Sequence, residues 1–148
     1  MVKLSMIKKM SYKIIGKYIK ELDFKIPNTK TFFLLSKNIS NYRINIDIKS
    51  VQIKKNIIEI LTSIKLNPLK KDLENINTKI VYSTIIELEN EKMKKEELER
   101  IILIDVPSKI YFELREIFIF LFKNSGFKDV KISKNIDFEK LYSLKKVQ

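Results

Sequence analysis

The chain has 148 residues, of which 45% are hydrophobic, and its 30 Lys and Arg against 18 Asp and Glu give a formal net charge of +12. It contains no Cys, no His and only two Gly, which excludes disulfides, thiolate and imidazole metal sites, Ser-His and Cys-His nucleophiles and Gly-rich phosphate loops. We therefore expect one domain that is not an enzyme and holds no metal and no cofactor.

The N-terminal segment carries lysines but no apolar stretch behind them, so it does not resemble a secretory signal. No apolar run in the chain approaches the roughly 20 residues of a membrane helix. We expect a cytoplasmic protein without direct membrane insertion. Met10 offers an alternative start, and residues 1–12 are expected to form a loose extension of a single domain that spans residues 1–148.

Four stretches with strand character come first, at residues 14–26, 42–53, 58–66 and 78–88. In the first stretch the period of two places Tyr18, Leu22, Phe24 and Ile26 on one face. The opposite face receives Ile19, Glu21, Asp23 and Lys25. Because the connections are short, sequential antiparallel pairing is the economical topology.

Helices are expected after the strands. A short one near residues 96–100 leads into a main helix at residues 107–124, and another follows near residues 137–144. Pro107 suits a first turn because its missing N–H costs nothing there, and Gly126 tolerates the left-handed cap conformation. The pattern predicts an α+β fold with a four-stranded antiparallel sheet, a long helix and a short C-terminal helix.

The main helix is apolar on more than one side. One stripe can cover the sheet, but the second needs another partner, which is either a second protomer or the short C-terminal helix. We favour a second protomer. The expected oligomer interface comprises Tyr111, Leu114, Phe118, Leu121 and Phe122.

The connection between the first two strands, residues 28–41, is unusually apolar for a surface segment. It contains Phe32, Phe33, Leu34, Leu35 and Ile39. These side chains either plug the edge of the core or form an apolar wall that contacts other polypeptides. The sequence alone leaves both interpretations open.

The positive charge has two interpretations. It indicates a polyanionic partner such as nucleic acid or a membrane surface, or it reflects a composition rich in Ile, Lys and Asn, whose codons are rich in A and T. Lysines are spread along the chain and arginines are few, namely Arg43, Arg100 and Arg115. Since phosphate and base contacts favour Arg, we favour the compositional interpretation and expect no nucleic acid partner.

Three blocks of the sequence resemble the SecB family of protein-export chaperones. They are the first strand from Tyr18 to Asn28, the Asp105-Val106-Pro107 start of the main helix with Arg115, and the closing segment from Asn124 to Phe127 and from Ile136 to Tyr142. Their order and spacing match the family over about residues 14–142.

The resemblance implies an ATP-independent holdase that assembles as a homotetramer, a dimer of dimers, and binds unfolded precursor proteins for export. Carried over by position, the client-binding residues are Phe32, Phe33, Leu34, Leu35, Ile39, Ile136, Phe138, Leu141 and Tyr142. The resemblance also implies delivery to the motor ATPase SecA through an outer sheet face with Glu21, Asp23 and Lys25. Lys25 stands where the family usually carries an acid, so we expect weak docking. The alternatives are a chaperone of a toxin–antitoxin system and a basic nucleic-acid-binding α+β protein.

Overall fold

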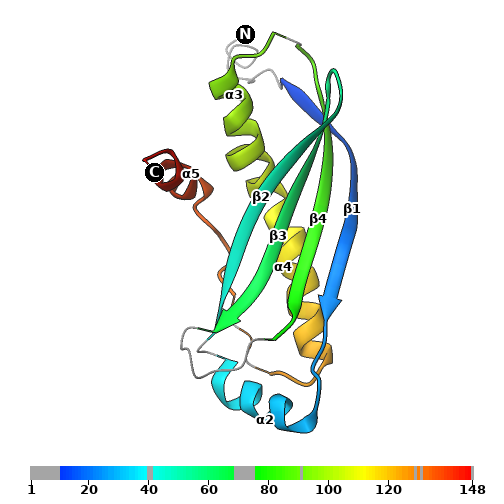
Figure 1. Ribbon diagram of the computed structural model, residues 1–148, viewed down its shortest axis with the longest axis vertical. Helices are drawn as coiled ribbons and strands as arrows, with labels where there is room; N and C mark the ends of the chain where they lie inside the picture. The colour runs from blue at the N-terminus through cyan, green and yellow to red at the C-terminus, as the bar shows by residue number, and fades with distance from the viewer. Residues whose placement is uncertain are drawn as a thin grey trace, which may run out of the picture.

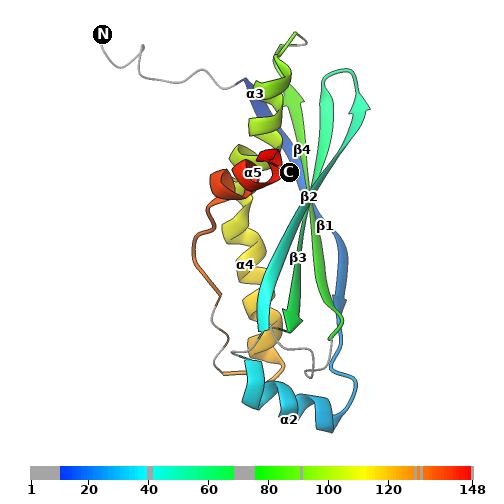
Figure 2. The ribbon, with the colours of Figure 1, turned by 60° about the vertical axis from the view of Figure 1, so that its left-hand side comes forward.

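The computed structural model describes residues 11–39, 42–68, 76–90, 92–128, 130 and 132–147. Its elements in chain order are β1 (Tyr12–Phe24), α2 (Thr29–Asn38), β2 (Tyr42–Lys54), β3 (Ile57–Pro68), β4 (Thr78–Leu88), α3 (Lys95–Arg100), η2 (Ile101–Asp105), α4 (Val106–Asn124) and α5 (Phe138–Val147). The strands form one layer, and α3, η2 and α4 form a second layer over one face (Figures 1 and 2). The predicted α+β class and four-stranded antiparallel sheet are confirmed.

The order of the strands differs from the predicted sequential pairing. The sheet has the order β1-β4-β3-β2, so β1 pairs with β4 and not with β2. The connection after β1 contains α2, which lies across one end of the sheet and carries the chain to the opposite edge (Figure 1). A segment of this length reaches across the sheet end, whereas a hairpin turn cannot. As a result, β1 and β2 are the two edge strands.

Two irregularities in β1 exchange the faces on which its side chains lie. Its register against β4 shifts between Ile14 and Gly16 and between Ile19 and Glu21. Each inserted residue reverses the alternation that follows it. Tyr18 therefore lies opposite Ser83 on the outer face, and Ile19 lies on the helix-covered face, which corrects the predicted alternation at these two positions.

The first strand also begins earlier than predicted. Tyr12, which was expected in the loose extension, starts β1 and is 3% exposed. Its hydroxyl donates a hydrogen bond to Asp105 at the end of η2, and Lys109 lies over its ring. Tyr12 thus joins the sheet to the helical layer. Residues 1–10 of the expected extension lie outside the described residues.

The core lies between the sheet and α4. The fully buried isoleucines of the central strands are Ile60, Ile64, Ile80 and Ile86. From α4 the buried side chains are Ile110, Leu114, Phe118 and Phe122, each at most 1% exposed. Burying a side chain of this size contributes about 1.5–3 kcal/mol, so this contact between the layers is the main source of stability.

The long helix begins before Pro107. α3, η2 and α4 follow one another without a break from Lys95 to Asn124. The N–H of Val106 donates to the carbonyl of Ile101, five residues earlier, in a π-helical turn directly before Pro107. Proline has no N–H and its ring crowds the preceding turn, and a widened turn relieves that conflict while the helix continues. In the described part of the chain, no helix is long and apolar enough to cross a membrane.

Candidate functional site

The apolar connection after β1 is a helix, α2, where the sequence analysis expected a loop. Asn28 caps it, because its side-chain oxygen accepts from the N–H of Thr31 at 2.8 Å. Leu35 is 1% exposed and belongs to the core, whereas Phe33 is 60% and Leu34 37% exposed. One side of the helix therefore plugs the edge of the core, and the other side presents apolar side chains to solvent.

α2 is held against the C-terminal end of α4. The ring of Phe32 lies 5.0 Å from that of Phe127. Gly126 has a φ of 95°, which favours glycine, and a Cβ built there would lie 3.3 Å from the Phe32 ring. The predicted glycine cap is confirmed, and it serves two purposes, because it ends α4 and leaves room for α2.

The turn at Gly126 has the hydrogen bonds of a Schellman motif. The N–H of Gly126 donates to the carbonyl of Lys123, and that of Phe127 donates to the carbonyl of Phe122. The rings of Phe122 and Phe127 are 5.6 Å apart. Ile39, another predicted client-binding residue, lines a hollow of about 230 Å³ next to this turn.

α5 repeats the arrangement of α2. Phe138 and Tyr142 are buried anchors, with Phe138 edge-on to Tyr111 and the Tyr142 hydroxyl donating to Glu99 at 3.0 Å. Leu141 is 42% and Leu144 57% exposed. The predicted client-binding set therefore divides into anchors and exposed side chains in both helices.

The two helices do not meet within one chain. The segment that links α4 to α5 runs back beside α4 (Figure 2). Tyr111 donates to the carbonyl of Ser133 at 2.7 Å, and Arg115 donates to that of Ile132 at 3.1 Å. Ile136, half-buried, ends this segment before α5. The predicted client-binding residues consequently occupy the two ends of a path along the long helix.

Most residues of the predicted oligomer interface are buried within the single chain. Tyr111, Leu114, Phe118 and Phe122 are buried in the core of the single chain and Leu121 is partly buried, because the sheet and the segment before α5 cover both apolar stripes. The large side chains that α4 leaves exposed are Phe112 at 64% and Phe120 at 63%. Edge strand β1 adds Ile15, Ile19 and Leu22, each more than 40% exposed.

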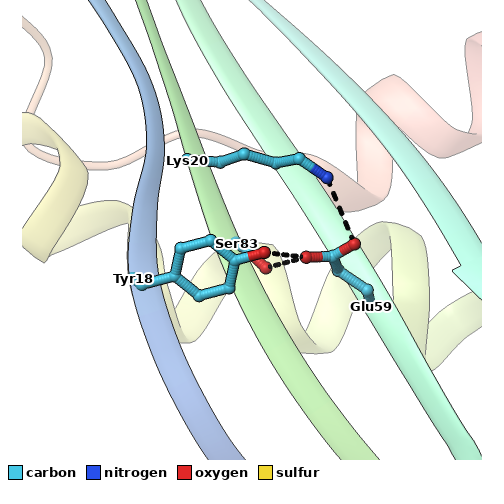
Figure 3. A network of polar contacts seen from close by, with 4 residues as sticks. All are labelled: Tyr18, Lys20, Glu59 and Ser83. Carbon is cyan, nitrogen blue, oxygen red and sulfur yellow. Dashed lines mark hydrogen bonds and ion pairs between the residues drawn. The ribbon is translucent and has the colours of Figure 1, made fainter. Parts of the chain in front are cut away.

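The outer face of the sheet carries a buried carboxylate. Glu59 on β3 is only 7% exposed. It accepts hydrogen bonds from the hydroxyls of Tyr18 and Ser83, the latter at 2.7 Å, and lies 3.4 Å from the ammonium group of Lys20 (Figure 3). The hydrogen bonds from Tyr18 and Ser83 lower the pKa of Glu59, so the face presents a fixed, ionised acid.

The predicted SecA-facing residues lie near this network. Glu21 and Asp23 share the outer face by register, and Glu21 lies 4.0 Å from Lys79. Both acids and Lys25 line a hollow of about 800 Å³ together with Lys65 and Lys79. Three lysines thus surround two acids, and this part of the outer face is positively charged.

A comparison with known families matches residues 6–148 to SecB, described as preprotein translocase subunit SecB. The chain belongs to the SecB family. A putative protein-export protein SecB from Pelagibacter ubique is 39% identical over 132 residues, which cover 89% of this chain and 94% of that protein. The protein-export protein SecB of Anaplasma phagocytophilum is 25% identical over 142 residues, covering 88% and 89% of the two chains.

A solved structure has the same fold as this SecB-family chain. It is a SecB-like chaperone from Mycobacterium tuberculosis in complex with a ChAD peptide from an antitoxin. The TM-score is 0.57 at 10% sequence identity, and the match covers 91% of this chain and 92% of the other. The resemblance predicted from the three sequence blocks is confirmed by these comparisons.

Proposed function

We propose that this SecB-family protein is an ATP-independent holdase that binds unfolded precursor polypeptides in the cytoplasm and keeps them ready for export. The observation that carries the proposal is the pair of exposed side chains Phe33 and Leu34 on a helix fixed by the buried Leu35. An apolar surface on a rigid support binds unfolded chains through burial, at roughly 25 cal/mol per Å². Such binding needs neither catalysis nor nucleotide.

The edge strand β2 supports this proposal. Ile44, Ile46 and Ile48 are half-buried on its helix-covered side, and in the described part of the chain the strand has a partner on one side only. A free strand edge offers backbone N–H and C=O groups to an extended polypeptide. A client that passes between α2 and α5 would gain hydrogen bonds that do not depend on its sequence.

The test is a Phe33→Ser/Leu34→Ser double variant, measured by light scattering as an unfolded model protein is diluted without nucleotide. We expect the concentration needed to suppress aggregation to rise about tenfold, with an unchanged circular dichroism spectrum. Leu35 is left intact because it belongs to the core. Val51→Ser/Ile53→Ser removes exposed apolar surface elsewhere and should retain activity. Full activity of the α2 variant would refute the assignment.

We further propose that the outer face delivers clients to SecA with weak affinity. Exposed charge pairs contribute only about 0–1 kcal/mol each, and Lys25 opposes Glu21 and Asp23. Lys25→Glu should tighten binding of the SecA tail peptide, and Glu21→Lys should abolish it, in calorimetric titration. Equal affinities of the three proteins would show that docking takes place elsewhere.

We propose a homotetramer, a dimer of dimers, assembled through the surfaces that the single chain leaves apolar. Phe112 and Phe120 on α4 and the exposed aliphatic residues of β1 support it, since apolar patches of this kind mark interfaces. Phe112→Ser/Phe120→Ser should lower the mass measured by light scattering at micromolar concentration. A monomeric wild-type protein would rule the assembly out.

The export role is supported by the names of the curated SecB relatives. Purification of the tagged protein from its cells distinguishes the export role from the alternatives. An export role predicts that many precursors co-purify, whereas a toxin–antitoxin role predicts one partner. A nucleic-acid-binding protein would lose affinity steeply with salt, whereas burial of apolar clients would not.

A further inference from the structure

The β2–β3 hairpin ends in a tip, residues 49–56, that is exposed, basic and apolar at once. Every residue from Lys49 to Lys55 is exposed, with Val51 at 46% and Ile53 at 52%. Residues 48–58 contain three lysines and no acidic residue. None of the functions proposed above uses the side chains of this tip, which lies at the end of the molecule opposite α2 (Figures 1 and 2).

The tip is fixed by its own contacts. The side-chain amide of Gln52 donates to the carbonyls of Lys54 and Lys55, at 3.3 and 3.2 Å. The N–H of Leu88 donates to the carbonyl of Asn56 at 2.7 Å and joins the turn to β4. Because the turn carbonyls have partners, the tip keeps its shape while its aliphatic side chains stay exposed.

The acids nearest the tip are already engaged. Glu59, opposite Val51, accepts hydrogen bonds from Tyr18 and Ser83, and Glu87 pairs with Lys13 at 3.3 Å. On the helical side of this end, residues 89–97 contain three lysines and four glutamates in sequence and so carry no excess positive charge. The excess positive charge at this end therefore lies on the hairpin.

We propose that the hairpin tip docks on the surface of an anionic lipid bilayer. Val51 and Ile53 enter the headgroup region, and Lys49, Lys54 and Lys55 lie against the lipid phosphates. Aliphatic side chains flanked by lysines suit a fluid anionic interface, where burial and charge act together. The proposal does not depend on the holdase function.

The composition of the tip favours lipid over the other polyanions and over a second copy. Residues 48–58 contain no Arg and no aromatic residue, so the tip lacks the bidentate and stacking contacts with which proteins bind nucleic acids. Two tips of like charge would repel each other. Docking would leave α2 directed away from the bilayer, at the far end of the molecule (Figure 1).

The test is flotation of the full chain with vesicles of phosphatidylcholine alone or mixed with phosphatidylglycerol, without any client. We expect binding only to the mixed vesicles. Each neutralised lysine should weaken it about fivefold, so Lys54→Glu/Lys55→Glu should abolish it. Lys30→Glu/Lys37→Glu makes the same charge change on α2 and should leave it intact. Val51→Ser/Ile53→Ser should lower affinity at least about tenfold.

A fluorescence measurement reports on insertion directly, because the chain contains no Trp. Ile53→Trp should shift its emission to shorter wavelength on mixed vesicles, while Phe33→Trp should not. Equal loss of binding in both lysine variants, binding to neutral vesicles, or an unshifted Ile53→Trp spectrum would overturn the proposal. The proposal would also be overturned if the protein did not bind vesicles but bound an oligonucleotide, and if Lys54→Glu/Lys55→Glu removed that oligonucleotide binding.

Discussion

The two faces of the sheet bury polar groups in opposite ways. On the covered face, Thr62, Thr78 and Thr84 are at most 1% exposed, and their hydroxyls have no hydrogen-bond partner among the described residues. On the outer face, Glu59 and Ser83 are also buried, but Glu59 accepts hydrogen bonds from the hydroxyls of both Ser83 and Tyr18 (Figure 3).

The difference shows that burial has two causes in this molecule. The covered face is buried by α4, whose apolar side chains exclude water and offer no hydrogen-bond partner to a threonine hydroxyl. Among the described residues no element covers the outer face, and its buried groups are covered by neighbouring polar side chains. Apolar packing therefore stabilises one face and a hydrogen-bond network the other.

The largest effect is expected on the covered face. Phe118→Ala should lower the free energy of unfolding by about 3–5 kcal/mol, because it leaves a cavity where the side chain is fully buried. Phe120→Ala, two residues along and 63% exposed in the single chain, is the comparison and should cost less, because it leaves no cavity in the core and only the proposed tetramer would cover it. Denaturant titration measures both. Equal losses would mean that the outer side of α4 is buried as deeply as the side that faces the sheet.

An intermediate and pH-dependent effect is expected on the outer face. Glu59→Gln should cost roughly 1–2 kcal/mol at neutral pH, because it removes hydrogen bonds to a charged acceptor. The pKa of Glu59 is lowered from its ordinary value of 4.5, so this stabilisation is present above pH 4.5 and is lost as the pH falls through the folded-state pKa. Unfolding measured between pH 7 and 3 should show the two proteins converging, and a constant difference would contradict the network.

The smallest effect compares two neighbouring residues of β4. Thr84→Val should be neutral or stabilise the protein by about 1 kcal/mol, because it removes an unpartnered hydroxyl at nearly constant volume. Ser83→Ala should destabilise by about 1 kcal/mol, because Glu59 loses a donor. Thermal unfolding of the two variants should therefore shift in opposite directions, and shifts of the same sign would remove the distinction between the faces.

The sequence predicted the secondary-structure elements better than it predicted which elements lie next to one another. Alternation at residues 42–48 and the cap at Gly126 are local patterns, and the structure contains both. The helix in residues 28–41 was missed because its apolar residues were interpreted as a loop, although Asn28 before Thr31 is a capping signal. The continuity of the expected short helix at residues 96–100 with the main helix was obscured by Pro107, since a proline usually marks a first turn.

What the sequence by itself determined is the α+β class, the absence of Cys and His chemistry and the membership of the SecB family, because composition, periodicity and short motifs are properties of the chain alone. The tertiary structure decided the pairing of β1 with β4, since pairing depends on where a connection travels. It also decided the faces of Tyr18 and Ile19, because one inserted residue reverses the alternation. It also decided that Phe118 is buried and Phe120 is exposed. The helix is apolar on most sides, so burial there depends on which element packs against each side and not on the type of amino acid.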